Sequence, residues 1–315
     1  MSGSRSFLLI ANPHAGGGRM AGQLPAIVQE LTARLGSVTV RETTRAGHAT
    51  DLAADFSASS SDGVVLSLGG DGTHNEVING LLRDGGSHTT MALLHAGTGG
   101  DFRRLLSTKG QVSATCDAIL SGKPSTIDAG RVTFHREGGG TAERFFLNIA
   151  SLGMAGLVDR LVGQSNKTFG GAATYFGATL RAALRYQPAV VTLTVDGEDR
   201  GTFSISNLCV CNGQYAGSGM HFAPQARLTD GLFDVIVLRH ASIPRSLPLV
   251  GQLYRGEHLG SPLVSVFRGS HIRVEPTTEA PAYMDIDGEA PGIAPAEFHL
   301  LGGALRVYGL RDDVL

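Results

Sequence analysis

The sequence predicts two domains of different class, an α/β domain over residues 1–127 and a β-rich antiparallel sandwich over residues 128–302. A chain of 315 residues is long enough to bury two separate cores. The sequence pattern changes near residue 128. Before it, predicted strands alternate with predicted helices; after it, short strands with period-two hydrophobicity are joined by Asp-Gly turns.

The first half predicts a parallel sheet. Strands are expected at FLLIA (7–11), VTVRET, VVLSL and MALLHAG, and helices over roughly 21–35 and through HATDLAADF and NEVINGLL. Strands that alternate with helices are typical of crossover connections, which place helices on both faces of the sheet.

The second half predicts hairpins. Strands are expected in AGRVTF, RFFLNIAS, VVTLTVDGEDRGTFSISNLCVCN, FDVIVLR, HIRVE and AYMDIDGE. Their period-two alternation and Asp-Gly turns are typical of an antiparallel sandwich. One helical stretch, at about 171–187, interrupts the strands.

Composition excludes several classes of protein. Lys and Arg total 26 against 28 Asp and Glu, so no basic field for nucleic acid is expected. Cys116, Cys209 and Cys211 are too few for a disulfide framework, and the last two share one sheet face.

The five apolar residues before Asn12 are too short for a signal core, and no later stretch could span a membrane. We therefore expect a cytoplasmic chain with buried, reduced cysteines.

Three glycine-rich turns follow strands of the first half. They are NPHAGGGR (12–19), LSLGGDGT (66–73) and HAGTGGDFRR (95–104). A turn from a parallel strand into a helix points backbone N–H groups and a helix dipole at one spot, and glycine lets a phosphate approach closely. Loops at the carboxyl ends of parallel strands line one crevice, so the three turns predict a phosphate cradle.

Asp71 lies inside the second of these turns. A carboxylate there would repel a phosphate directly, so a divalent cation or a water is its natural partner. The turn is no Walker loop, because no Gly-Lys-Ser/Thr follows it. A plain tight turn with a self-bonding Asp is the alternative.

The chain resembles the diacylglycerol kinase catalytic domain family, which includes bacterial lipid kinases, sphingosine kinases and ceramide kinases. The resemblance covers nearly the whole chain. Its motifs are Asn12-Pro13 with Gly16–Gly18, TTRAGHATDLA, GGDGTHNEVINGL, GTGGDFRR, FLNIASLGMAG, CNGQYAGSG, PQARLTDGLFDV and DIDGE.

The resemblance implies an ATP site of the kind found in NAD kinase and phosphofructokinase, and a return of residues 303–315 to the first domain. It implies nucleotide contacts at Asn12, Gly16, Gly17, Gly18, Thr43, Gly69, Gly70, Gly72, Thr73, Glu76, Asn79, Gly97 and Thr98. It implies Mg²⁺ at Asp71 and at a loop with Arg227, Asp230 and Leu232. It implies catalysis by Asp71 and by the Asp-Gly-Glu motif of Asp287 and Glu289, in which Asp287 takes the proton from the lipid hydroxyl.

Two departures from the family pattern concern nucleotide selection. Gly100 stands where the family usually has Asn, and Gly217-Ser218-Gly219 replaces a run of three glycines. Loss of the amide at position 100 motivates one alternative, a catalytically silent nucleotide or lipid sensor. ATP binding is expected to survive both changes.

Asp-Gly-Glu occurs twice. Asp196-Gly197-Glu198 lies between two strand patterns and is expected to be a hairpin turn. Asp287-Gly288-Glu289 leads into APGIAP, where we expect no returning strand at hairpin distance. Asp287 is therefore the predicted base.

The acceptor is the least determined part of the prediction. Diacylglycerol is the first expectation, with ceramide or a sphingoid base as the alternative, for which Asp159 would be the carboxylate near an amine. A nicotinamide dinucleotide kinase or a phosphofructokinase is a further alternative. A bilayer substrate implies peripheral membrane association without a spanning helix. A homodimer is left open.

Overall fold

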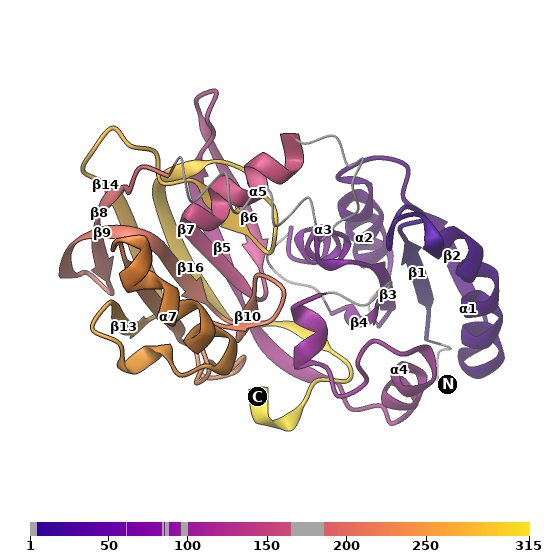
Figure 1. Cartoon of the computed structure of the whole chain (residues 1–315). Coiled ribbons are helices and arrows are strands. Elements are labelled where there is room, and N and C mark those ends of the chain that lie inside the picture. Colours follow the sequence, from indigo (N-terminus) through magenta and orange to yellow (C-terminus); the bar gives the residue numbers. More distant parts are fainter. Residues whose placement is uncertain (1–4, 61, 84, 86–87, 96–99, 165–185) are drawn as a thin grey trace. The chain divides into compact units, whose positions relative to one another are not determined.

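The computed structural model describes residues 5–60, 62–83, 85, 88–95, 100–164 and 186–315. The chain divides into two compact units. Unit 1 comprises residues 1–129, 227–230 and 301–315, and unit 2 comprises 130–226 and 231–300. The sequence placed the first boundary at 127/128 and the return at 303, and it did not foresee that 227–230 belong to unit 1. Figure 1 shows the elements of both units.

Unit 1 is built on a parallel sheet, as predicted. Its strand order is β2 (Val38–Glu42), β1 (Phe7–Ala11), β3 (Val64–Gly69), β4 (Thr90–His95) and then the end of β16 (Ile293–Val307). All of these pairs are parallel, and β16 joins β4 through Arg306 and Val307. Every residue of β3 is buried, as its continuous apolar run requires for a strand covered on both faces.

Helices cover both faces of this sheet. On one face, Leu9 and Ala11 of β1 share a cluster with α1 (Arg19–Leu35) and α4 (Val112–Leu120). The alternate residues Leu8 and Ile10 are also buried, and α2 (His48–Ser59) and α3 (Asp71–Leu81) pack against β1, β3 and each other. The short helices η1 (Phe102–Leu105) and η3 (Asp312–Val314) complete the unit.

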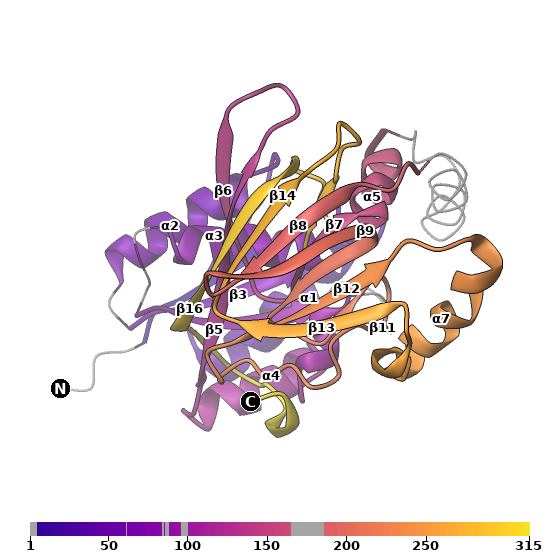
Figure 2. The same cartoon turned by 90° about the vertical axis from the view of Figure 1, so that its left-hand side faces the viewer.

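Unit 2 is an antiparallel sandwich, also as predicted. One layer runs in the order β6 (Thr141–Phe146), β5 (Ser125–His135), β16, β14 (His271–Pro276), β8 (Val190–Val195) and β9 (Glu198–Cys211). The other holds β15 (Met284–Ile286), β7 (Ile149–Gly153), β12 (Phe233–Arg239) and β13 (Val264–Gly269). The long β9 serves both layers, because it pairs with β8 up to Ser204 and with β7 and β12 beyond it. Figure 2 shows this succession of strands.

Aromatic side chains fill the space between the layers. Phe146 stacks on Phe233 with ring centroids 5.7 Å apart and meets Phe298 edge-on at 6.3 Å. Cys209 and Cys211 lie on the opposite face of β9, in a second cluster with α7 (Ile243–Arg255). The predicted shared face of these two cysteines is confirmed, and all three cysteines are buried and free.

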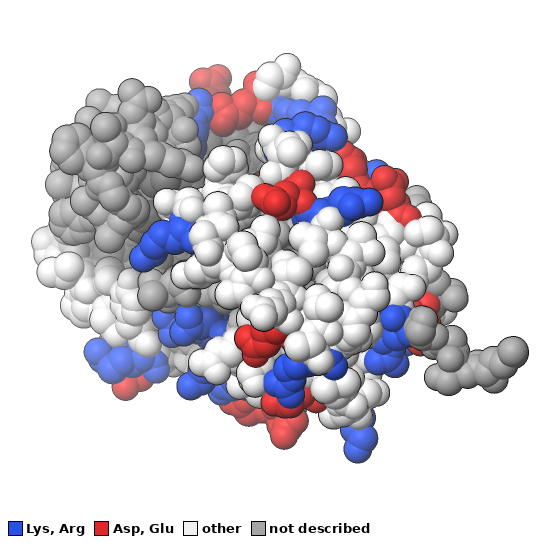
Figure 3. Space-filling view, turned by 90° about the vertical axis from the view of Figure 1, so that its right-hand side faces the viewer, with Lys and Arg blue, Asp and Glu red and all other residues white. Residues whose placement is uncertain are grey.

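The smaller elements of unit 2 are α5 (Met154–Gln164), η2 (His258–Gly260) and the hairpin of β10 (Tyr215–Ala216) and β11 (Met220–His221). The helical stretch predicted at 171–187 falls almost wholly outside the described residues. Within the described ranges, no helix is both long enough and apolar enough to cross a membrane. On the face drawn in Figure 3, acidic and basic side chains are interspersed, without a continuous field of one sign.

Two helical glycines provide a matched test of the packing of unit 1. A Cβ on Gly80 of α3 would lie 2.3 Å from the backbone oxygen of Thr50 in α2, whereas one on Gly22 of α1 would meet nothing within 4 Å. Gly22→Ala should raise the free energy of unfolding by up to about 1 kcal/mol through helix propensity. Gly80→Ala should lower it by roughly 1–3 kcal/mol, because overpacking outweighs propensity. Urea denaturation of the two variants beside the wild type measures both signs, and equal effects would contradict the packing assigned to α2 and α3.

Candidate functional site

The turn between β3 and α3 is fixed by a close contact of its own. A Cβ on Gly69 would lie 2.5 Å from Thr73, so only glycine fits where the strand ends. Thr73 is buried, and its hydroxyl accepts a hydrogen bond of 3.1 Å from the Asn12 amide. The Asn12 N–H in turn donates to the carbonyl of Leu68 at 2.9 Å. Two of the predicted cradle turns are thereby tied together at the carboxyl ends of β1 and β3.

The loop after β1 requires glycine for a different reason. Gly16, Gly17 and Gly18 adopt φ angles of 63°, 72° and 84°, a region that L side chains rarely occupy. A Cβ on Gly17 or Gly18 would meet nothing within 4 Å, and the same holds for Gly70 in the second turn. Backbone groups at these positions are therefore open to a close-lying ligand, as a phosphate site needs.

Asp71 is the first residue of α3. Its Oδ2 accepts a hydrogen bond of 2.9 Å from the N–H of Asp101, which ties the second turn to the third. Its Oδ1 is buried and has no hydrogen-bond partner among the described residues. Burial raises the pKa of the Asp71 carboxyl above its ordinary value. A buried carboxylate oxygen without a partner among the described residues fits a ligand to Mg²⁺.

Packing in the third turn explains why glycine, and not the Asn usual in the family, stands at position 100. Gly100 has a φ of 119°, and a Cβ there would lie 2.4 Å from Cε1 of His95. The His95 ring thus occupies the space that a side chain at position 100 would need. Gly97 and Thr98, the predicted nucleotide contacts of this turn, lie outside the described residues.

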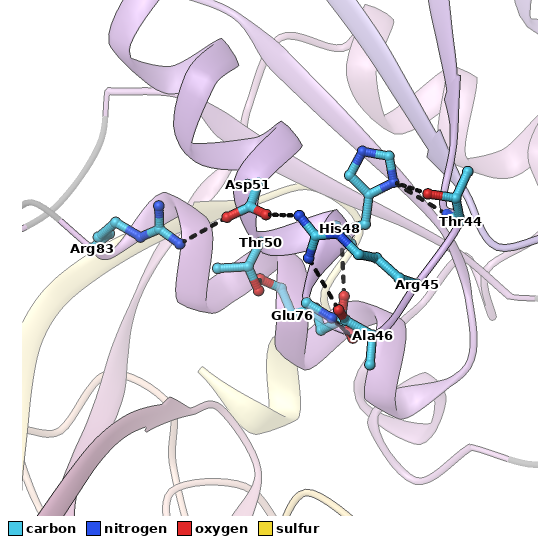
Figure 4. Close-up of polar contacts among 10 residues, drawn as sticks. Thr44, Arg45, Ala46, His48, Thr50, Asp51, Glu76 and Arg83 are labelled. Atoms are coloured by element: carbon cyan, nitrogen blue, oxygen red, sulfur yellow. Dashed lines mark hydrogen bonds and ion pairs between the residues drawn. The ribbon is translucent and has the colours of Figure 1, made fainter.

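Glu76 caps a neighbouring helix. Its Oε1 accepts from the N–H of Gly47 at 2.8 Å and its Oε2 from the N–H of Ala49 at 3.1 Å, as Figure 4 shows. The carboxylate thereby satisfies the N-terminus of α2, which would otherwise attract an anion. The Asn79 amide donates to the carbonyl of Asn75, one turn back, at 2.8 Å. Nucleotide contact by Glu76 and Asn79 stays a prediction.

Two arginines, one in the loop before α2 and one after α3, lie on the surface of unit 1 beside Asp51. Asp51 accepts from Arg45 at 2.6 Å and from Arg83 at 3.3 Å (Figure 4), and the Arg45 hydrogen bond lowers the pKa of Asp51. Nδ1 of His48 accepts from the N–H of Thr44 at 3.1 Å. The predicted contact residue Thr43 is buried and pairs through its N–H with Ala11 at 2.9 Å.

In unit 2, backbone amides hold the carboxylate of Asp287. Oδ1 accepts from the N–H groups of Asn148 at 3.2 Å and Ile149 at 3.1 Å, and Oδ2 accepts from that of Leu147 at 3.2 Å. The donors come from the connection between β6 and β7. These bonds stabilise the charged carboxylate and fix its position.

Buried amide side chains that the sequence did not reveal support this arrangement. Asn212 donates through Nδ2 to the carbonyl of Leu147 at 2.7 Å, and the N–H groups of Asn212 and Gly213 donate to the carbonyl of Asn148. Asn148 donates through its own side chain to the carbonyl of Tyr215. The available signal was that each Asn ends an apolar run, FFLN or CVCN, where a buried amide needs partners.

The two Asp-Gly-Glu motifs prove more alike than predicted. Asp196 and Gly197, with φ angles of 50° and 82°, form the expected turn between β8 and β9. Asp287 and Gly288 have φ angles of 47° and 90°, and Ile286 pairs across them with Glu289. The prediction that no strand returns after Asp287 was therefore wrong, because a second bridge joins Tyr283 to Ile293, the first residue of β16.

What separates the motifs is the target of each carboxylate. Asp196 uses Oδ1 alone, which accepts from the N–H groups of Ser270 at 3.0 Å and His271 at 2.8 Å. Asp287 uses both oxygens, as described above. Beside it, the buried Asp285 accepts from the N–H of Gly288 at 2.8 Å, and the sequence had not singled it out. The side chain of Glu289 forms an ion pair with Arg144.

The predicted second metal loop lies between β11 and β12. Arg227 and Asp230 are exposed, Leu232 is half-buried, and Arg227 donates through its guanidinium to the carbonyl of Leu315 at 2.9 Å. A metal role for this loop stays a prediction. Asp71 and Asp230 belong to unit 1, and Asp287 belongs to unit 2.

Among the described residues, one cluster of side chains in unit 2 has the residue types and distances that could hold a metal ion. His271 and His299 lie opposite each other on β14 and β16, and with Glu297 they offer ligand atoms within 4.8 Å of one another. His271 bonds Glu297 at 2.6 Å and thereby lowers the pKa of that carboxyl. Arg131 and Arg273 contribute positive potential here and oppose a dication, so the structure favours the hydrogen-bonded pair.

Asp71 should carry a stability cost that depends on pH. Because its pKa is raised in the folded state, the stability that the protonated acid contributes is present below the ordinary value of 3.8 and is lost as pH rises through the raised pKa. Asp71→Asn avoids this loss. Its melting temperature should therefore exceed that of the wild type by more at about pH 8 than at about pH 5.

Addition of Mg²⁺ and ATP should reverse that order, since only the wild type presents a carboxylate to the cation. Differential scanning fluorimetry with and without Mg²⁺ measures both effects. If the melting temperatures of Asp71→Asn and the wild type differ by an amount that is independent of pH and of Mg²⁺, the turn has a purely structural role.

Comparison with known proteins accords with this arrangement. Residues 6–132 match the family model described as the diacylglycerol kinase catalytic domain, and residues 148–309 match the model described as the YegS C-terminal NAD kinase beta sandwich-like domain. The diacylglycerol kinase of Bacillus subtilis (strain 168) is 26% identical over 292 residues, which cover 92% of this chain and 91% of the relative. That of Staphylococcus carnosus (strain TM300) is 25% identical over 96% of this chain and 95% of the relative.

Solved structures share the fold. The crystal structure of a diacylglycerol kinase from Bacillus anthracis str. Sterne superposes with a TM-score of 0.70 at 21% identity and covers 100% of both chains. The two family models match residues in both units, and the relatives align over nearly the whole chain. The chain therefore belongs to the diacylglycerol kinase catalytic domain family, and it is a lipid kinase.

Proposed function

We propose that this lipid kinase transfers the γ-phosphoryl group of Mg·ATP to the hydroxyl of a membrane lipid, with diacylglycerol as the preferred acceptor. The observation that carries the proposal is the buried Oδ1 of Asp71 at the start of α3, which has no hydrogen-bond partner among the residues that the structure describes. A carboxylate in that position suits a cation-bound nucleotide. Curated relatives named diacylglycerol kinase support the choice of acceptor.

The nucleotide phosphates would lie against backbone groups of unit 1. The open positions at Gly17, Gly18 and Gly70 allow close approach, and the first amides of α3 point along a helix dipole that favours negative charge. Thr73 and Asn12 hold the two loops together, so their hydrogen bond preorganises the cradle. Asp71 would hold the cation. Bound Mg²⁺ would neutralise charge that develops on the phosphoryl oxygens.

Asp287 would orient the acceptor hydroxyl and receive its proton. Phosphoryl transfer passes through a loose transition state, so the protein contributes chiefly position and charge. A carboxylate held by three amide hydrogen bonds is well positioned, and its charge is stabilised. We therefore expect proton transfer to come late, once bonding to phosphorus has made the hydroxyl acidic.

Packing accounts for glycine at position 100, because its φ is 119° and the His95 ring occupies the space of a side chain. The amide that the family usually has at this position is absent all the same, so the transfer assays below test the sensor alternative.

Asp287→Asn tests the base, and Asp196→Asn is its matched control. Both residues have positive φ in Asp-Gly turns, where Asn is well tolerated. Asp287→Asn should reduce kcat by roughly two to four powers of ten while the KM for ATP stays near its wild-type value. Asp196→Asn should keep wild-type kinetics, because an Asn oxygen can accept all the bonds that Oδ1 of Asp196 accepts.

Thermal denaturation must accompany these kinetics. An Asn at position 287 sets an amide donor against one of the three backbone N–H groups, so a modest loss of stability is expected there alone. Equal kinetic damage at both positions, in folded variants, would reject Asp287 as the base.

The acceptor is tested by transfer of labelled phosphate from ATP to diacylglycerol, ceramide, sphingosine and NAD⁺, presented side by side, with the lipids in mixed micelles. Diacylglycerol should give the highest kcat/KM. If the wild type prefers sphingosine and Asp159→Ala loses that preference, the protein is a sphingoid-base kinase. Transfer to NAD⁺ alone would replace the lipid acceptor with a dinucleotide.

A further inference from the structure

Helix α7 of unit 2 carries two apolar faces. Leu249 and Leu253 are 7% and 6% exposed and pack in the cluster that contains Ile236 and Leu238 of β12. Ile243, Leu247, Val250 and Tyr254 form a second face, to which we refer as the α7 stripe. They are 64%, 67%, 48% and 53% exposed.

The stripe is unusual among the described residues. Large hydrophobic side chains are exposed at six described positions, and four of these are the stripe; the others are Leu120 and Val266. The steps of four, three and four residues along the stripe place its members on one side of the helix. Scattered exposed apolar residues are ordinary, but a contiguous row of this kind marks an interaction surface.

The charges on α7 are of one sign. The helix contains Arg245 and Arg255 and no Asp or Glu, and Arg239 precedes it. Glu257, just beyond the helix, pairs with Arg255 at 2.7 Å, but both side chains are about 60% exposed, so water and salt weaken the pair. An apolar row accompanied by arginines is complementary to a surface that is apolar beneath and anionic above.

We propose that the α7 stripe is the surface by which this kinase docks on an anionic phospholipid bilayer. The inference rests on the proposed function, because an acceptor that resides in a bilayer must be reached there. A helix of 13 residues is about 20 Å long and would lie in the interface plane rather than span the membrane. Tyr254, with an apolar ring and a polar hydroxyl, suits the headgroup level.

The anchoring of α7 fits this role. Leu249 and Leu253 fasten the helix to the sandwich, and Gly256, with a φ of 70°, ends it. Figure 2 shows α7, in orange, at the margin of the strands of unit 2. Because the packing face and the stripe are separate sides of one helix, docking would not require the core to open.

Vesicle binding tests the proposal without any use of ATP. The wild-type chain should co-sediment with vesicles of phosphatidylglycerol and phosphatidylcholine and much less with phosphatidylcholine alone, and salt should weaken binding. The double variant Leu247→Gln, Val250→Gln should bind the anionic vesicles roughly ten-fold more weakly. Leu120→Gln removes an apolar side chain that is 60% exposed elsewhere, and it should bind as the wild type does.

A spectroscopic readout separates insertion from simple adhesion. The chain contains no tryptophan, so Tyr254→Trp introduces a single reporter on the stripe. Its emission should shift to the blue when anionic vesicles are added, whereas that of Leu120→Trp should not. Equal binding by the wild type and the double variant, or a shift in both tryptophan variants, would overturn the proposal.

Two further outcomes distinguish this inference from its rivals. A wild-type dimer that the double variant dissociates, with vesicle binding unchanged, would assign the stripe to a second copy of this chain. Vesicle binding through the stripe without phosphate transfer to any lipid would leave the docking surface standing and overturn the proposed function. Transfer of phosphate to lipid in micelles, together with vesicle binding that does not depend on the stripe, would support the proposed function and overturn the docking surface.

Discussion

The arrangement of the glycine turns in unit 1 depends on one constraint, which is to keep the carboxylate of Asp71 inside a turn. One of its oxygens accepts from the N–H of Asp101, and the other is buried without a partner among the described residues. Burial of such a group is unfavourable unless something compensates it. The turn keeps its geometry despite this cost because Gly69 lets Thr73 pack closely and because the Asn12 amide donates to the Thr73 hydroxyl. The ends of β1, β3 and β4 are thus held around an acid that the fold alone does not need.

Asp287 in unit 2 presents the contrasting case, an acid that its surroundings fully support. Three amides hold its carboxylate, and those amides are positioned by a second set of bonds from Asn212 and the backbone of Gly213. The difference suits two roles. An oxygen without a protein partner among the described residues is suited to a cation, whereas a carboxylate positioned by three amides is suited to orienting a hydroxyl. Under the proposed function the same residue type would serve both roles because its environment differs.

The sequence predicted the parallel sheet of unit 1 well, because runs such as VVLSL must be buried on both faces and because each glycine turn follows a strand. It predicted the Asp196 hairpin for the same local reason, since Asp-Gly lies between two alternating strands. It failed at the second Asp-Gly turn, where only isolated bridges, Ile286 with Glu289 and Tyr283 with Ile293, join the two sides and leave no alternating pattern in the sequence. The bonds from Asn212 to Leu147 and between His271 and Glu297 join distant segments, and no local pattern encodes such partners.

Helix α7 shows why burial is needed to interpret an apolar pattern. Leu249 and Leu253 repeat at helical spacing, and so do Leu247, Val250 and Tyr254, so the sequence contains two equivalent candidates for the core face. Packing against β12 selects the first pair. A globular helix needs only one such face, and a second one left in water is unfavourable for solubility. Under the proposed function the second face has a physical use, because a bilayer that contains the acceptor is a solvent in which an apolar face is stable.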